Sequence, residues 1–253
     1  MTNKIPNSFC SAIATHTYIS PQCERRMCCA SREESQYAGG TQYIDIGSSG
    51  NQTFAPMDLK TWWNSEYLRG IRVMMKNGIN PPQCQVCNEK ILSESAYKKW
   101  FNEFLFRDKL QEIYDSIDEN GYVENLPVSY DYRFSNLCNF KCRMCGENLS
   151  SSWESEKRKH GLWSPQHQPF MVDEVKTAMQ KFQVDVVEAE FKDAVTRGIV
   201  EECYWVGGEP LMYDIHWWAL EEMVKNGSAK NCYLRYNSNL SRTTFNGKDL
   251  FDY

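Results

Sequence analysis

The sequence has little that would place the protein in a membrane or on nucleic acid. None of its apolar runs approaches the length of a membrane-spanning helix, and its first residues lack the apolar core of a secretory signal. Acidic residues outnumber basic ones, 33 to 28, so the formal net charge of -5 provides no overall positive field. We therefore expect a cytoplasmic protein with neither a membrane nor a nucleic-acid partner.

Histidine is also scarce, and the sequence contains no internal repeat that would indicate a solenoid. The four histidines stand alone, so we expect packing or surface roles for His16, His160, His167 and His216. The length of 253 residues and the 42% hydrophobic content are enough for one large domain or two modest ones.

Cysteine, in contrast, is abundant, with eleven residues in the chain. The odd total, the closely spaced pairs and the lack of an export signal argue against a disulfide scaffold and favour metal or cluster ligation. Cys203 and Cys232 are exceptions, because each lies singly in an apolar, strand-like run. We expect these two to be buried free thiols.

One short loop concentrates three of the cysteines. Cys138, Cys142 and Cys145 follow an alternating, strand-like segment at 128–134 with the spacing C-x3-C-x2-C. Three thiolates on one loop can hold three irons of a cubane cluster and leave the remaining iron without a protein ligand. The alternative is a zinc knuckle, which needs a fourth ligand that no nearby cysteine or histidine supplies.

The region around this loop has the pattern of a parallel α/β sheet. A helical region at 147–200 is followed by a strand at 201–206, a helix at 216–224 and a strand at 232–236. Ligands bind at the carboxyl ends of such strands. Three polar or cysteine-bearing segments follow the three strands, namely the cysteine loop, Gly207-Gly208-Glu209-Pro210 and Asn237-Ser238-Asn239. We expect them to meet at one rim of the sheet.

The first half of the chain is less regular. A helical pattern at 58–75 ends at Asn77-Gly78 and is followed by a knuckle at 81–87. A polar stretch at 31–56 predicts loop or short strands, and 93–120 predicts helices. The sequence thus divides into a cysteine-rich α+β module at 1–92, a helical linker at 93–126 and an α/β part at 127–253.

The cysteine triplet and the Gly-Gly-Glu-Pro segment after the next strand resemble the radical S-adenosylmethionine superfamily over residues 128–240. The resemblance implies an α/β, TIM-like partial barrel. Only its first strands are readable before the sequence ends, so the resemblance implies that the chain is truncated or is completed by a second polypeptide. Half a barrel would leave an open parallel edge and an uncovered apolar face.

The resemblance also implies an activity and a set of site residues. A 4Fe–4S cluster binds Cys138, Cys142 and Cys145, and the amino and carboxylate groups of S-adenosylmethionine chelate the open iron. An electron from a flavodoxin or ferredoxin cleaves the sulfonium, and the resulting deoxyadenosyl radical abstracts a hydrogen from the substrate. The cofactor-binding residues would be Met144, Gly207, Gly208, Glu209, Pro210, Asn237 and Asn239.

The residues themselves leave some of these roles open. Met144 stands where the family usually has an aromatic residue, and its flexible side chain could still pack against adenine. Glu209 could meet the ammonium group or simply cap the following helix. Asn237 and Asn239 could meet the carboxylate or the ribose, or serve as turn residues.

The N-terminal cysteines resemble the Twitch module, the short form of the SPASM domain. The resemblance implies an auxiliary iron–sulfur cluster on Cys10, Cys28, Cys84 and Cys87, with Cys29 as the alternative to Cys28. Spacing alone also allows zinc. Relatives with auxiliary clusters often modify peptides, so we expect a peptide, protein or small-molecule substrate. The alternative function is a non-catalytic iron–sulfur or zinc-binding scaffold.

Overall fold

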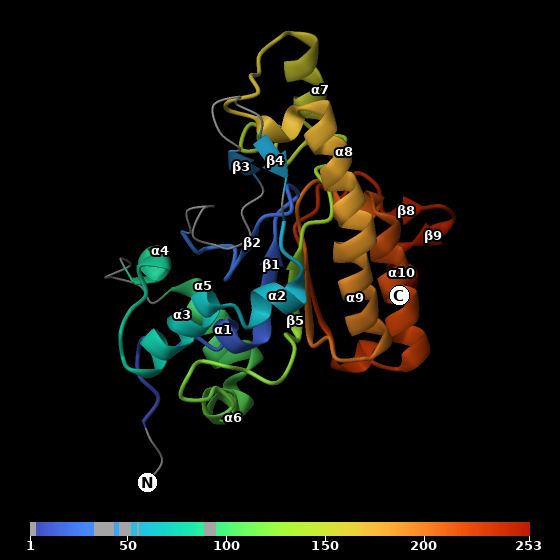
Figure 1. Cartoon of the computed structure of the whole chain (residues 1–253). Coiled ribbons are helices and arrows are strands. Elements are labelled where there is room, and N and C mark those ends of the chain that lie inside the picture. The colour runs from blue at the N-terminus through green and yellow to red at the C-terminus, as the bar shows by residue number, and fades with distance from the viewer. Residues whose placement is uncertain (1–3, 33–42, 46–51, 55, 89–94) are drawn as a thin grey trace. The chain divides into compact units, whose positions relative to one another are not determined.

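The computed structural model describes residues 4–32, 43–45, 52–54, 56–88 and 95–253, and it shows a mixed α/β chain (Figure 1). The chain forms two compact units. The cysteine-rich unit comprises Met1–Tyr18, Arg25–Gly40 and Met57–Pro127, and the sheet unit comprises Ile19–Glu24, Thr41–Pro56 and Val128–Tyr253. Residues 93–126, for which the sequence predicts a separate linker, therefore belong to the cysteine-rich unit. Two short segments of the predicted module belong to the sheet unit instead.

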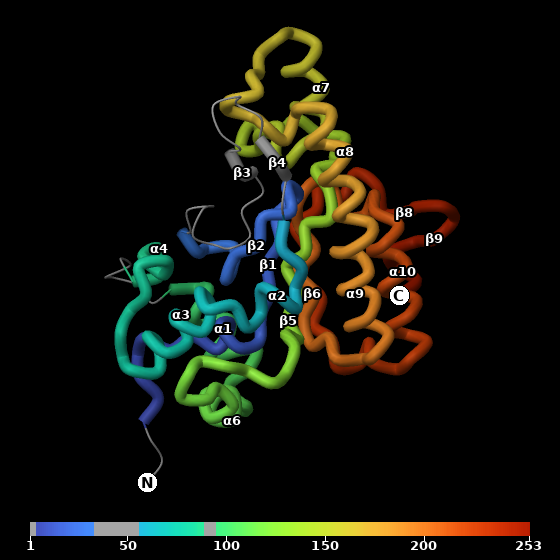
Figure 2. The backbone as a smooth tube through the Cα atoms, in the orientation of Figure 1, coloured from blue at the N-terminus to red at the C-terminus, as the bar shows by residue number. Residues whose placement is uncertain are grey.

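The sheet unit contains three parallel strands that pair in chain order, and Figure 2 shows the first two side by side. They are β5 (Ser129–Tyr132), β6 (Glu202–Trp205) and β7 (Tyr233–Tyr236). In register, Ser129 lies opposite Glu202, and Glu202 lies opposite Tyr233. The strands predicted from the sequence are confirmed to within a few residues.

Helices connect these strands. From β5 to β6 the chain passes through α7 (Ser151–Lys159), η5 (Pro169–Met171), α8 (Asp173–Phe182), the π-helical segment η6 (Gln183–Val187) and α9 (Glu188–Thr196). The segments α8, η6 and α9 form one continuous helical column (Figure 2). From β6 the chain passes through η7 (Pro210–Met212), α10 (Asp214–Asn226) and η8 (Ala229–Asn231) to β7. Gly198 and Gly227 follow α9 and α10 with φ of 67° and 76°, the left-handed conformation that ends helices at glycine.

An aromatic cluster joins the sheet to α9. Alternate residues of a strand face the same side, and Tyr130, Tyr132, Phe134 and Trp205 surround Phe191 with ring centroids 5.3 to 6.2 Å away. All five side chains are buried. This cluster is the core of the sheet unit.

The opposite face of the strands is polar, which differs from the apolar face that the sequence predicts. Ser129, Asp131 and Glu202 are fully buried there. Arg133 pairs with Asp131 at 3.0 Å, and Arg235 pairs with Glu202 at 2.6 Å. Buried carboxylates are tolerated because each has a guanidinium partner.

Short antiparallel pairs complete the sheet unit. After β7 the chain forms β8 (Thr244–Phe245), β9 (Lys248–Asp249) and η9 (Leu250–Asp252). The strands β3 (Tyr43–Asp45) and β4 (Gln52–Phe54) pair within the predicted polar stretch; the rest of that stretch from 33 to 55 lies outside the described residues.

The cysteine-rich unit is built mainly from short helices. Its elements are α1 (Ala12–Thr15), β1 (His16–Ile19, whose last residue belongs to the sheet unit), β2 (Arg25–Arg26), α2 (Leu59–Trp63), α3 (Glu66–Lys76), η2 (Pro82–Cys84), α4 (Gln85–Asn88), α5 (Ala96–Lys99), the π-helical η3 (Trp100–Leu105), η4 (Arg107–Lys109) and α6 (Leu110–Asp115). The predicted helix at 58–75 is two helices, because Ser65 accepts a hydrogen bond from the Leu68 amide and starts α3 anew.

A buried arginine links the pieces of this unit. Arg72 donates to the carbonyls of Ile13 and Gly121 and to the side chain of Asn64, at 2.9 to 3.1 Å. Its guanidinium also lies over the Trp63 ring. Burial lowers the pKa of Arg72 to about 10, so the group remains charged at neutral pH.

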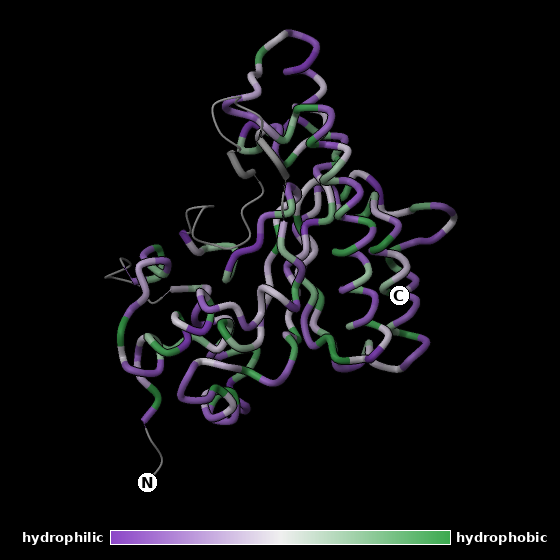
Figure 3. The backbone as a smooth tube through the Cα atoms, viewed as in Figure 1, coloured by the Kyte–Doolittle hydropathy of each residue, from purple (hydrophilic) through white to green (hydrophobic). Residues whose placement is uncertain are grey.

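Hydrophilic and hydrophobic residues both occur along each of the long helices (Figure 3). Among the described residues, no helix is long and apolar enough to cross a bilayer. The histidine predictions are confirmed, since His16 and His216 are buried packing residues and His160 and His167 are exposed.

Candidate functional site at the strand ends

The structure brings the three predicted loops together at the carboxyl ends of β5, β6 and β7. The amide of Glu209 donates to the carbonyl of Leu137 at 2.7 Å, which joins the second loop to the first. The side-chain amide of Asn239 donates to the side-chain oxygen of Asn139 at 3.1 Å, which joins the third loop to the first. The shared rim that the sequence predicts is therefore present.

The cysteine loop carries three neighbouring thiols. Cys142 is exposed, and Cys138 and Cys145 are half-buried. Partial burial raises the pKa of Cys145, and negative charge on Cys142 and Cys138 would raise it further. The sulfur of Cys138 also accepts from the Phe140 amide at 3.4 Å and from the Asn239 side chain at 3.8 Å.

The first turn of α7 holds this loop in place. Ser151 accepts from the Cys138 amide at 3.0 Å, and Ser152 donates to the Cys138 carbonyl at 2.8 Å. The Trp153 indole donates to the Cys142 carbonyl at 2.9 Å. Sequence reasoning missed these residues. The signal for them is a run of three serines at 150–152 before an acidic residue, which is typical of a helix start.

The two glycines of the second loop are required by a close approach of backbones. Gly207 and Gly208 have φ of 87° and 59°. A Cβ at Gly208 would lie 2.4 Å from the Leu137 carbonyl oxygen, and one at Gly207 would lie 2.7 Å from the Cβ of Arg133. The sequence predicts that these glycines admit a ligand. In the structure Gly208 allows the close approach of the Leu137 carbonyl, and Gly207 allows that of the Arg133 side chain.

Glu209 connects the second loop to the third. It is fully buried, and its carboxylate accepts from the Ser238 hydroxyl and the Asn239 amide, both at 2.7 Å. It also accepts from the Leu211 amide at 3.2 Å and so caps η7, which begins at the buried Pro210. The capping role that the sequence leaves open for Glu209 is therefore present.

Tyr213 is a second connecting residue, and the sequence alone did not indicate it. Its hydroxyl lies within hydrogen-bonding distance of two carbonyls, that of Ser135 at 2.7 Å and that of Gly207, and shares its one hydrogen between them. Burial, with further contributions from Cys138 and Glu209, raises the pKa of Tyr213 well above its usual value. The hydroxyl therefore remains a donor throughout the physiological range.

The remaining predicted residues are open to a ligand to different degrees. Met144 is 93% exposed, so its side chain is available to a bound molecule. Asn237 is exposed, and its side-chain amide donates to the Tyr204 hydroxyl at 2.8 Å. Asn239 is half-buried and holds the cysteine loop as described above.

The cysteine-rich unit brings its own four predicted ligands together. Cys10, Cys28, Cys84 and Cys87 line one small cavity of about 40 Å³, with an apolar wall that includes Phe101. Burial raises the pKa of Cys10 to about 11 and that of Cys28 well above its usual value. Cys28 lines this cavity, whereas Cys29 is not among the described residues that do.

All eleven cysteines lie in the described part of the chain, and each is a thiol. Cys203 is buried as predicted, but Cys232 is only half-buried because it lies just before β7, whose residues are partly exposed. No cysteine of the two predicted ligand groups is therefore held in a disulfide.

The chemistry of the two groups fits iron–sulfur clusters. Among the residues that the structure describes, no three Cys, His, Asp or Glu side chains surround one point as ligands of a single metal ion do. The ligands of a cubane cluster need not surround one point, because each thiolate binds a different iron. Coordination deprotonates a thiol, so loading Cys10 and Cys28 would release protons.

No protein-family model, curated protein or solved structure matches this chain.

Proposed function

We propose that the sheet unit is part of a TIM-like radical S-adenosylmethionine barrel. In this proposal Cys138, Cys142 and Cys145 hold a 4Fe–4S cluster at which S-adenosylmethionine is reductively cleaved, and a hydrogen is then abstracted from a substrate. The observation that supports it most is the hydrogen bond from Glu209 to Leu137, because it places the Gly-Gly-Glu-Pro loop against the cysteine loop. A zinc knuckle has no need of this second loop.

The chain's own groups would tune and position the bound cluster. The amide of Phe140 and the side chain of Asn239 donate to the sulfur of Cys138. Hydrogen bonds to the ligand sulfurs and exposure to solvent set the reduction potential of such clusters. When bound, the cluster supplies the electron that splits the sulfonium.

The second loop would receive the methionyl end. The Glu209 carboxylate already accepts three hydrogen bonds, so we assign the ammonium group to backbone carbonyls of the 207–210 loop, which includes Gly207, Gly208 and Pro210. We assign the exposed Asn237 to the carboxylate or the ribose, and the exposed Met144 to adenine.

The remaining parts of the proposal concern partners. We assign an auxiliary cluster to Cys10, Cys28, Cys84 and Cys87, with zinc as the alternative, and a flavodoxin or ferredoxin as the electron donor. β7 is the last of the three parallel strands, so a second polypeptide could complete the barrel there. The polar face with Asp131, Glu202 and Arg235 suits a polar peptide, protein or small-molecule substrate.

The test is anaerobic reconstitution of the full chain with iron and sulfide, followed by dithionite and S-adenosylmethionine. We expect 5′-deoxyadenosine from the wild type and from the control Cys232→Ala, and none from the triple variant Cys138→Ala/Cys142→Ala/Cys145→Ala. Cleavage that survives the triple substitution would overturn the assignment. A chain that takes up one zinc, forms no cluster on the loop and cleaves nothing would instead be the non-catalytic scaffold.

A further inference from the structure

A buried serine hydroxyl bonds one of the four predicted ligands of the cysteine-rich unit. Ser95 is only 4% exposed, and its hydroxyl donates to the sulfur of Cys87 at 2.9 Å. Cys87 lines the small cavity that Cys10, Cys28 and Cys84 also line. The hydroxyl of Ser95 therefore acts directly on a sulfur of the proposed auxiliary site.

Ser95 occupies a position at which a serine usually caps a helix. It is the N-cap residue of α5, and an N-cap hydroxyl normally accepts from an amide of the first helical turn. Ser65 does so at the start of α3, where it accepts from the Leu68 amide. The side chain of Ser95 makes no capping hydrogen bond. Helix capping thus does not account for the hydroxyl of Ser95, which is directed to Cys87 instead.

This hydrogen bond is strongest when Cys87 is a thiolate. The sulfur of a neutral thiol is a weak acceptor. A hydrogen bond to an ionised acceptor is about twice as strong as one between neutral groups, and coordination to a metal keeps a cysteine deprotonated. The buried hydroxyl is therefore better satisfied when Cys87 is a ligand than when it is a free thiol.

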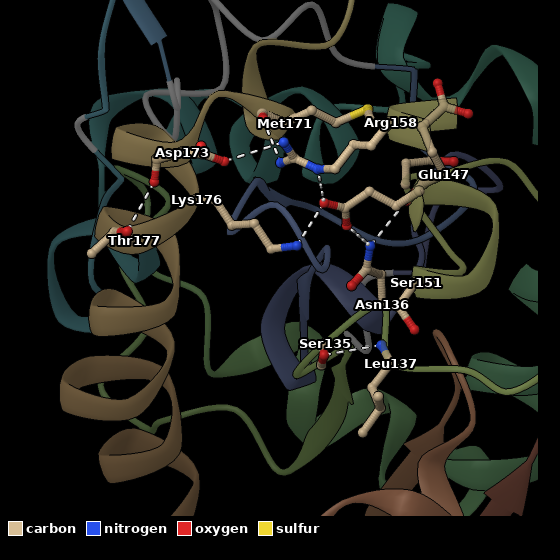
Figure 4. Close-up of polar contacts among 12 residues, drawn as sticks. Ser135, Asn136, Leu137, Glu147, Ser151, Arg158, Met171, Asp173, Lys176 and Thr177 are labelled. Atoms are coloured by element: carbon tan, nitrogen blue, oxygen red, sulfur yellow. Dashed lines mark hydrogen bonds and ion pairs between the residues drawn. The ribbon is translucent and has the colours of Figure 1, made fainter. Parts of the chain in front are cut away.

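Polar side chains near the cysteine loop of the sheet unit bond one another rather than a sulfur. Figure 4 shows Asn136 and Lys176 directed toward the carboxylate of Glu154, to which they donate at 2.9 and 2.5 Å. The two donors to the Cys138 sulfur lie 3.4 and 3.8 Å from it. Ser95 lies closer to its sulfur than either of these donors does.

We infer that Ser95 is a positioning residue of the auxiliary site and that its hydroxyl raises the reduction potential of a cluster bound through Cys87. The inference rests on the auxiliary iron–sulfur cluster proposed above. A donor to a ligand sulfur stabilises the more negative, reduced cluster and so raises its potential. The effect of a hydrogen bond is larger in apolar surroundings, and Ile13, Met27 and Phe101 line this cavity.

The test measures the midpoint potential of the auxiliary cluster alone. The parent is the full chain with Cys138→Ala/Cys142→Ala/Cys145→Ala, reconstituted anaerobically with iron and sulfide. Electron paramagnetic resonance follows the reduced cluster during a titration with dithionite and redox mediators. Adding Ser95→Ala should lower the midpoint, so that the ratio of reduced to oxidised cluster at the parent's midpoint falls about fivefold, the effect of one hydrogen bond.

A second pair of variants isolates the hydroxyl. Ser95→Thr and Ser95→Val have the same shape, but only threonine keeps the hydroxyl. The midpoint of the valine variant should lie below that of the threonine variant by a similar amount. Equal midpoints in this pair would overturn the inference, and this comparison decides it even if Ser95→Ala does not take up a cluster.

Ser65→Ala is the matched control, because it removes a serine that does cap its helix. This variant should unfold at a lower urea concentration than its parent but keep the parent's midpoint potential. If Ser65→Ala lowers the potential as much as Ser95→Ala does, the shift reports a general loosening of the unit, and the inference is wrong.

Two further results separate the role of Ser95 from the cluster on which it depends. If the cluster forms with the same midpoint in the parent and in Ser95→Ala, the role of Ser95 is overturned and the auxiliary cluster stands. If the parent takes up zinc or no cluster at all, the auxiliary cluster itself is wrong, and the inference falls with it.

Discussion

The backbone amide of Glu209 donates a 2.7 Å hydrogen bond to the carbonyl of Leu137. This bond joins the loop after β6 to the loop after β5. Gly208 lies against the same carbonyl, and Tyr213 bonds both loops. The position of the three cysteines therefore depends on residues that are distant from them in the sequence.

Gly208→Ala should separate the two loops. The new Cβ would lie 2.4 Å from the Leu137 carbonyl oxygen, in a backbone with φ of 59°. Strain and overpacking together should lower the free energy of unfolding by about 3 kcal/mol. Urea denaturation measures this change.

Gly161→Ala is the matched control for that experiment. Gly161 has a similar φ of 64°, but nothing lies within 4 Å of a Cβ there. We expect only the backbone strain, roughly 1 kcal/mol. Equal losses in the two variants would show that the contact with Leu137 is unimportant.

Glu209→Gln should loosen the third loop. Three donors converge on the buried carboxylate, from Leu211, Ser238 and Asn239. An amide keeps one oxygen and turns its NH₂ group toward a donor, so we expect a loss of about 1–3 kcal/mol in the free energy of unfolding. The exposed Glu174→Gln should change this free energy by less than about 0.5 kcal/mol. A neutral Glu209→Gln would contradict the connecting role.

Much of the sheet unit could be predicted from its sequence, because its signals are local. Alternating residues marked β5, and the spacing of three cysteines marked the loop. The parallel order of the strands then placed three loops at one rim.

The connections between these loops could not be predicted, because they depend on packing between distant residues. Nothing near Tyr213 in the sequence indicates that its hydroxyl reaches Ser135. The polar face was missed for a related reason, since the sequence does not show that Arg133 and Arg235 lie beside the buried Asp131 and Glu202. Residues 93–126 looked like a linker because their contacts with the cysteine-rich unit are not local.

Stability should fall in mild acid because of His216. Burial lowers its pKa from 6.5 to about 4, and its ring bonds the Tyr236 hydroxyl at 3.0 Å. Between pH 6.5 and about pH 4, His216 takes up a proton in the unfolded chain but not in the folded chain. The free energy of unfolding should therefore decrease as pH falls through this window, by at most about 3 kcal/mol.

Two variants, His216→Gln and His160→Gln, isolate the contribution of His216 to the pH dependence of stability. Urea denaturation at pH 7.5 and pH 5 should show a smaller pH dependence for His216→Gln than for wild type. The exposed His160→Gln should keep the pH dependence of wild type. If His216→Gln loses as much stability on acidification as wild type does, the buried neutral histidine is not the cause.

The cavity in the cysteine-rich unit predicts different effects of substituting Cys28 and Cys29. Cys28 lines it with Cys10, Cys84 and Cys87. In reconstituted protein, Cys28→Ala should lower bound iron by about four atoms per chain, the content of one cubane. Cys29→Ala should leave the iron content unchanged. The reverse result would assign Cys29 as the ligand, and zinc in place of iron would favour the alternative metal.

The most direct test of the central claim uses the variant Cys84→Ala/Cys87→Ala, which leaves only the loop site to hold a cluster. Its dithionite-reduced form is examined by electron paramagnetic resonance with and without S-adenosylmethionine. We predict a cluster signal that changes when S-adenosylmethionine is added, because an open iron binds it. A signal that S-adenosylmethionine leaves unchanged, or no signal at all, would contradict the assignment of Cys138, Cys142 and Cys145.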